Sequence, residues 1–414
     1  MKTTLLSAIL FTFCLLSCTN DDGGDFGKDT PRYDIPLSTK SGEINTQVQR
    51  FSFDFYREIA KAEKDKENFC ISPLSASLCL GMVLNGADGN TYTEMQKTLG
   101  FEGFTNQQIN EYVQMMQTEL PKLDGRTIFT NANSLWVRNG FPLLPEFIQT
   151  NQTYYNAEVS NEPFDNSTVE KINSWCNQKT NGLIPEIIDN IPGSAVSYLI
   201  NAIYFKGIWK YEFKESETKD ETFYLANGGM VRVPTMRQTQ GHNYYADEDV
   251  QVIELPYGNG AFSMVLFIPA DRKKKDLDKV IADLDVETWL NWNENMHPAE
   301  VTIYLPRFLI KTEKELIETM AALGIHDAFD SFNANFANMS TVYGLYIEKL
   351  KQKTYIELNE AGTEAAAVTI SGINLSSGGH PYPAEIRFDH PFGYVLKEKS
   401  TGAILFAGKV GKPE

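Results

Sequence analysis

Apolar residues recur along this chain with two different periods, and each period predicts one kind of element. Residues 44–64 carry apolar side chains three or four positions apart. These are Val48, Phe51, Phe55 and Ile59. This spacing places them on one face and predicts an amphipathic helix.

Three further segments also have helical signals. Ser72 precedes Pro73 and an apolar run that ends before Gly86, which is the order of an N-cap, a first helical residue and a helix stop. A helix is also expected over residues 168–179. We expect another over residues 312–323, capped by Thr312 and ended by Gly324.

Strand signals dominate the rest of the chain. Residues 194–209 form a long apolar run rich in β-branched and aromatic side chains, which is typical of a strand buried on both faces. Residues 250–270 and 391–410 predict hairpins, and the first of them turns at Asn259-Gly260. Residues 301–310 predict one more strand. We therefore expect an α+β fold with large mixed sheets, in one continuous domain over residues 46–414.

The segment 357–386 allows two interpretations. Thr363 followed by Glu364, Ala365, Ala366 and Ala367 is typical of a capped helix start, because alanine is the best helix former. The alternation of small residues at positions 363, 365, 367 and 369 predicts a strand instead. The pattern alone does not decide between them.

Composition limits the function further. The chain has 414 residues, of which 42% are hydrophobic, and a net charge of −17, from 54 acidic against 37 basic residues. This charge argues against nucleic acid and anionic membrane surfaces as partners. The chain contains no local catalytic, nucleotide or metal motif, and its five histidines are scattered. We expect no enzyme activity, no cofactor and no metal, although a Ser/His/Asp site assembled only in three dimensions stays an alternative.

The N-terminus has the pattern of a targeting segment. Lys2 is followed by an apolar run from Leu5 to Leu16 and by Ser17-Cys18, which resembles the lipobox of bacterial lipoproteins. We expect a signal peptide over 1–17, a lipid on Cys18 and a flexible tether over 18–45. This predicts a bacterial outer-membrane lipoprotein that faces the periplasm or the cell surface. An ordinary signal peptide with an incidental cysteine is the alternative.

The remaining cysteines lie on apolar segments. They are Cys70, Cys79 and Cys176. An odd number without a CxxC pair predicts buried free thiols, so no disulfide is expected to hold the fold.

Several separated blocks together resemble one family. They are NFCISPLSASLCLGMVLNGADGNTYTEMQKTLGF, LINAIYFKGIWKYEFKESETKDETFY, VPTMRQTQ with VIELPY, YIELNEAGTEAAAVT, and HPFGYVLKEKSTGAILFAGKV. Their order and spacing over residues 50–412 are similar to those of the serpins, the serine protease inhibitor superfamily. The resemblance implies a monomer with the serpin fold and an exposed reactive-centre loop after residue 360.

In serpins a protease cuts this loop, and the cut loop enters a sheet as an extra strand with the protease still attached. The resemblance implies a hinge composed of Glu360, Gly362, Thr363, Glu364, Ala365, Ala366, Ala367 and Thr369. Small side chains suit this role, because bulky ones would overpack the sheet on entry. This favours the strand interpretation of the segment.

The family spacing places the cut bond between Ser376 and Ser377. The segment after it is longer than usual, so Ile373, Asn374 and Leu375 are alternatives. No Lys or Arg lies between residues 360 and 386, which argues against trypsin-like targets. We expect elastase-like or subtilisin-like serine proteases as partners, and also papain-like cysteine proteases.

Two more groups are implied only by the resemblance. Ser72, Ser75, Asn201 and Gln352 match the serpin shutter, a hydrogen-bonded network under the sheet. Gln352 stands where the family has a histidine, so the network would lack a pH-sensitive group. Trp209 matches the tryptophan of the breach, where the loop enters. A non-inhibitory serpin that binds or stores a ligand is the main alternative function.

Overall fold

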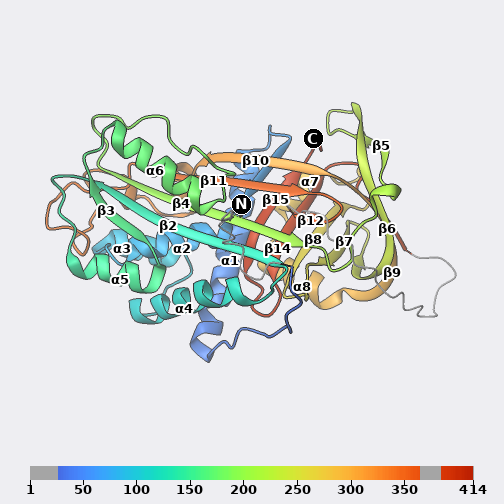
Figure 1. Cartoon of the computed structure of the whole chain (residues 1–414), viewed down its shortest axis with the longest axis horizontal. Coiled ribbons are helices and arrows are strands. Elements are labelled where there is room, and N and C mark those ends of the chain that lie inside the picture. The colour runs from blue at the N-terminus through green and yellow to red at the C-terminus, as the bar shows by residue number, and fades with distance from the viewer. Residues whose placement is uncertain (1–26, 364–383, 414) are drawn as a thin grey trace, which may run out of the picture.

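The computed structural model describes residues 27–363 and 384–413. Figure 1 shows two large sheets with helices gathered around them. The helices of the described residues are α1 (Thr39–Ala62), α2 (Pro73–Leu84), α3 (Gly89–Thr98), α4 (Asn106–Glu119), α5 (Pro145–Tyr155), α6 (Asn166–Lys179), α7 (Leu277–Ala282), α8 (Val286–Asn295) and α9 (Ile317–Leu323).

The sheet that matters most for function has six strands in the order β10-β11-β12-β4-β2-β3. Its strands are β2 (Thr127–Arg138), β3 (Glu158–Glu162), β4 (Ser197–Ile208), β10 (Phe308–Glu315), β11 (Lys349–Leu358) and the two-residue β12 (Gly362–Thr363). One face packs against α2 and the other against α6. This confirms that the central strand β4 is buried on both faces, as its apolar composition predicts.

The other sheet has nine strands in the described residues, ordered β1-β15-β14-β8-β7-β6-β9-β13, with β5 paired to β6. They are β1 (Asn68–Ile71), β5 (Lys219–Tyr224), β6 (Met230–Ala246), β7 (Val250–Pro256), β8 (Phe262–Pro269), β9 (His297–Pro306), β13 (Ala384–Arg387), β14 (Phe392–Glu398) and β15 (Ile404–Val410). The hairpins β7–β8 and β14–β15 confirm both hairpin predictions. The α+β class with mixed sheets is confirmed.

The helix boundaries show where local signals suffice. Ser72 caps α2, and its Oγ accepts a hydrogen bond from the backbone of Ser75. The prediction that Thr312 caps a helix is wrong, because residues 308–315 form strand β10. The hydroxyl of Thr312 instead accepts a hydrogen bond from the backbone N–H of Cys70 at 2.8 Å. Helix α9 begins only at Ile317 and ends at Gly324, whose φ of +118° suits glycine.

Two other predictions need adjustment. The single strand expected over 301–310 divides at Arg307 into β9 and β10, which belong to different sheets. The tether expected up to residue 45 is too long, because α1 begins at Thr39 and Ile35 is already buried. Cys70, Cys79 and Cys176 are buried and free, as expected.

Candidate functional site at the open end of the six-stranded sheet

Strands β4 and β11 are joined at one end and separated at the other. At the joined end they form a parallel pair from Lys349, opposite Tyr198, to Lys353, opposite Ala202. At the open end the short strand β12 lies between them and pairs with both (Figure 1). The residues of β12 belong to the predicted hinge, so the beginning of the predicted loop already lies within the sheet.

The alignment of β4 with β11 is the same at the closed end and at the open end. Gln352 lies opposite Asn201 in the closed part, while Thr363 lies opposite both Leu358 and Gly207 in the open part. Leu358 and Gly207 are each six residues beyond the closed pair. The two strands can therefore separate further without slipping along each other.

Gly362 fits this position because a side chain would not. Its φ is +148°, and a Cβ atom there would lie 2.0 Å from the carbonyl oxygen of Gly207. Only glycine accepts this conformation and this approach without strain. The glycine that sequence reasoning assigned to the hinge therefore has a direct structural reason.

Thr363 is held in place by Tyr257. It is buried, and its Oγ1 lies 2.6 Å from the phenolic oxygen of Tyr257. The ring of Tyr257 stacks on Trp209 with a centroid distance of 4.2 Å. Trp209 donates from its indole nitrogen to the carbonyl of Asn359 at 3.0 Å. The structure thus places Trp209 directly against the segment that enters the sheet.

A charged clasp holds Glu360, the first residue of the predicted hinge. The carboxylate of Glu360 accepts hydrogen bonds from Arg307 Nε at 2.8 Å and Nη2 at 2.5 Å, and another from the Thr218 hydroxyl. Burial alone would raise the pKa of Glu360, but these hydrogen bonds outweigh it and hold the pKa below its usual value. Arg307 occupies the crossing between the two sheets, so the clasp fixes the hinge to both.

At the closed end, neutral groups tie β11 to the start of α2. The side-chain amide of Gln352 accepts from the backbone N–H of Ser72 at 2.9 Å and donates to the Ser72 carbonyl at 3.0 Å. The Ser72 hydroxyl donates to the carbonyl of Leu405 at 2.5 Å. Glutamine at this position therefore ties β11 to the start of α2 through two hydrogen bonds.

The expected four-residue shutter is divided in the structure. The side chain of Asn201 forms no hydrogen bond to the side chains of Gln352, Ser72 or Ser75 among the described residues. Its Nδ2 donates to the side-chain oxygens of Asn131 at 2.9 Å and Asn133 at 2.8 Å, both on β2. The physical reason is the strand pairing, which places Asn133 directly opposite Asn201.

Several buried polar atoms near this end have no hydrogen-bond partner among the described residues. They are Ser75 Oγ, Ser77 Oγ, Asn131 Nδ2, Asn133 Nδ2 and Asn201 Oδ1. Each buried polar atom without a partner costs about 1–3 kcal/mol. The closed end therefore holds unused donors and acceptors below β4.

Sequence reasoning missed five contributors to the site. They are Asn131, Asn133, Thr218, Tyr257 and Arg307. The two asparagines had a usable signal, because their spacing of two puts both on one face of a strand. The others depend on long-range packing. Glu364, Ala365, Ala366, Ala367 and Thr369, and the candidate bond residues from Ile373 to Ser377, lie outside the described residues.

Among the described residues, no group of three His, Cys, Asp or Glu side chains could hold a metal ion. In the same part of the chain, no helix has both the length and the apolar character that a membrane span requires.

The fold is thus an α+β fold in which the two-residue strand β12, at the start of the predicted loop, lies between two central strands of a six-stranded sheet. In a comparison with known families, residues 46–413 match the serpin (serine protease inhibitor) family. The chain belongs to the serpin family.

Similar proteins include an elastase inhibitor and a thyroxine-binding globulin. Neuroserpin of Homo sapiens is 32% identical, in an alignment that covers 89% of this chain and 91% of neuroserpin. The leukocyte elastase inhibitor of Equus caballus is also 32% identical, and that alignment covers 90% of this chain and 100% of the inhibitor. The structure is similar to that of the thermophilic serpin tengpin in its native state (TM-score 0.83, 30% identity, 93% and 97% covered). It is also similar to that of human thyroxine-binding globulin in complex with thyroxine (TM-score 0.81, 26% identity, 91% of this chain and 100% of that chain covered).

Proposed function

We propose that this serpin inhibits proteases by suicide trapping, in which a cut loop continues the insertion that β12 has begun. The observation that carries the proposal is the position of Gly362 and Thr363 between β4 and β11, in the register of the closed pair. The expected result is a covalent complex, and each inhibitor molecule is consumed once.

The register fixes where an inserted loop would lie. Continuing β12 antiparallel to β4 brings Thr369 to the level of Asn201 and Gln352, and Ile373 to the level of Ser197, where β4 begins. The Thr369 hydroxyl would then lie beside the Asn201 oxygen that has no partner among the described residues. Insertion would thus add partners in the layer where the closed sheet lacks them.

The same register supports Ser376 as the residue before the cut. Residues 364–373 would fill the remaining slot, and residues 374–376 would extend past its end. At about 3.3 Å per residue, Ser376 would travel to roughly 40 Å beyond the level of Thr363. A protease bound to Ser376 would then be carried clear of the sheet and to the opposite end of β4.

The loop sequence supports a proposal for the class of protease that cuts it. Positions 361–385 contain no Lys or Arg, while Leu375 and Ser376 offer an apolar and a small side chain. A protease pocket built around a carboxylate would keep its charge unpaired. We propose elastase-like or subtilisin-like serine proteases, and papain-like cysteine proteases as a second group.

The test is to mix the protein with an elastase-like, a subtilisin-like and a papain-like protease and to examine the products on denaturing gels. The proposal predicts an adduct that resists denaturant with at least one of them, and sequencing of the released peptide should begin at Ser377. Clean cleavage of the loop without an adduct would instead favour a non-inhibitory serpin that binds or stores a ligand.

We also propose, from the sequence pattern alone, that Cys18 carries a lipid and anchors the serpin at the outer membrane. Labelling cells with a radioactive fatty acid should mark the protein, and Cys18→Ala should remove both the label and the membrane association. Unchanged labelling of the variant would contradict the anchor.

A further inference from the structure

Residues 27–37, which we call the N-terminal strap, are bound along the body of the protein. The strap begins beside the segment that leads into β2, where the Gly27 N–H donates to the Gly125 carbonyl at 2.7 Å. The Gly125 N–H in turn donates to the Thr30 hydroxyl at 3.0 Å. Asp29 forms an ion pair with Arg126 at 2.9 Å. These contacts run in both directions, so the strap is bound there by a set of mutual hydrogen bonds.

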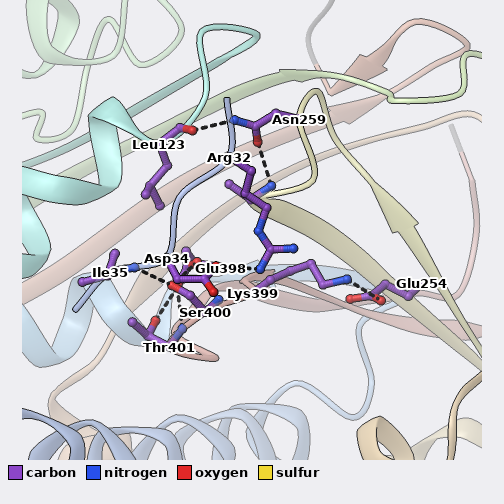
Figure 2. A network of polar contacts seen from close by, with 11 residues as sticks. Arg32, Asp34, Ile35, Leu123, Glu254, Asn259, Glu398, Lys399, Ser400 and Thr401 are labelled. Carbon is purple, nitrogen blue, oxygen red and sulfur yellow. Dashed lines mark hydrogen bonds and ion pairs between the residues drawn. The ribbon is translucent and has the colours of Figure 1, made fainter. Parts of the chain in front are cut away.

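The other end of the strap is fixed at the turn between β14 and β15. Ile35 is buried, with 4% of its surface exposed, and its N–H donates to the Ser400 hydroxyl at 3.0 Å. Ser400 and Thr401 both donate to the carboxylate of Glu398, as Figure 2 shows. The buried isoleucine and this turn therefore hold the strap in place on the apolar core.

Asn259 connects the strap to two loops at once. Its Nδ2 donates to the Leu123 carbonyl at 2.7 Å, as Figure 2 shows. The same Nδ2 donates to the Thr30 carbonyl at 3.2 Å, and the Asn259 Oδ1 accepts from the Ala261 N–H. The backbone N–H of Asn259 also donates to the carboxylate of Asp124 at 3.0 Å. The strap and Asn259 together clamp residues 123–126 to the turn at 257–260.

This clamp reaches the hinge through one residue, Ile208. The Gly258 N–H donates to the Ile208 carbonyl at 2.9 Å, and the Ile208 N–H donates to the Arg126 carbonyl at 3.2 Å. Ile208 is the β4 residue that lies opposite Gly362. Both segments held by the strap therefore bond to the point of β4 where the loop enters.

The clamp acts on only one of the two strands that flank β12. It binds the end of β4 and the chain leading into β2, whereas β11, on the other side of β12, bonds to neither clamped segment in the described residues. Further insertion requires β4 and β11 to move apart. We propose that the strap is a brake on strand insertion, which fixes the end of β4 and keeps the uncut loop from entering beyond Thr363.

The clamp can be tested by hydrogen exchange on the chain beginning at residue 19. Thr30→Val removes the hydroxyl that Gly125 uses, and Ile35→Ala removes buried contacts at the far end of the strap. Both should speed exchange of the Ile208 and Gly258 amides by at least about fivefold, while the Ser72 amide at the closed end changes less than about twofold. Asp34→Ala is the matched control, because Asp34 pairs with Arg32, which lies on the strap itself.

The brake needs a second measurement, which depends on the proposed insertion. Uncut protein is incubated at a temperature below its melting point, and the appearance of a more heat-stable form is followed. Both strap variants should form it at least about fivefold faster than the parent and the Asp34→Ala control. Faster exchange at every amide, or faster exchange at Ile208 with an unchanged rate of conversion, would overturn the brake. If cutting the loop adds no heat stability even in the parent, the proposed function fails, whereas the exchange result still tests the clamp.

Discussion

The two ends of the β4–β11 pair are held by different chemistry. The open end has a charged clasp, Glu360 with Arg307, and a glycine that alone fits beside Gly207. The closed end has neutral amides and hydroxyls, with Gln352 tied to Ser72 and Asn201 tied to β2. A charge pair and a glycine hold β12 between the two strands at the open end, while neutral hydrogen bonds tie each strand to its neighbours at the closed end.

The largest effect should come from blocking entry at the open end. Thr363→Arg places a long cation at a buried position, where the Thr363 hydroxyl lies 2.6 Å from the phenolic oxygen of Tyr257. We expect insertion to stop and the loop to be cut as a substrate, so that at least about ten times more inhibitor is consumed per protease inactivated. Titration of protease activity measures this ratio. Thr341→Arg, on an exposed loop, should leave the ratio unchanged.

The next effect concerns the glycine of the hinge. Gly362→Ala should lower the free energy of unfolding by about 2–4 kcal/mol, because the new methyl group meets the Gly207 carbonyl and φ is positive. Urea denaturation measures the change. Gly42→Ala on α1 is the control, since nothing lies near its added methyl group. Equal stability of the two variants would show that the hinge is not confined as described.

A smaller effect is expected at the closed end. Gln352→Ala leaves the backbone N–H and carbonyl of Ser72 without their partners and should cost about 1–3 kcal/mol. Exchange of the Ser72 amide should rise, whereas that of the Trp209 amide, at the open end, should not. Gln152→Ala, on an exposed face of α5, should change neither. A rise at both ends would mean that the two ends do not act separately.

Acid should weaken the open end, because the clasp there depends on the charged Glu360 carboxylate. The lowered pKa of Glu360 means that its clasp stabilises the protein above the unfolded-state pKa, and that this contribution is lost as the pH falls through the folded-state pKa. After correction for intrinsic exchange rates, opening at the Trp209 amide should increase on acidification. Glu360→Gln should remove most of this pH dependence. A variant that keeps the full dependence would point to another titrating group.

Local sequence signals accounted for much of the fold. Ser72, Pro73 and Gly86 mark α2 because capping depends on neighbours in sequence, and β4 is recognisable from its continuous apolar run. The cap predicted at Thr312 was wrong, because a threonine before a polar segment is compatible with a helix cap and with a strand at the edge of a sheet. Its true partner, Cys70, lies 242 positions away.

The site was predicted in part. The motif placed Gly362, Thr363 and Trp209 at the entry point, but it did not identify Tyr257, Arg307 or the split of the asparagine layer. Which acceptor Asn201 chooses depends on strand pairing with residues 68 and 70 positions away, which spacing does not fix. The sequence predicted a tether here because the Gly, Asp and Pro content of the strap is typical of linkers, and the contacts that bind the strap to the body are long-range.

The central claim is that the intact sheet is short of one strand and gains stability when it receives it. The direct test is to cut the loop with a protease, remove the protease, and compare thermal unfolding of intact and cut protein. Ten additional strand residues at about 0.5–1.5 kcal/mol for each hydrogen bond should raise the melting temperature by roughly 10 °C or more. A cut protein that melts at or below the temperature of the intact one would contradict the account.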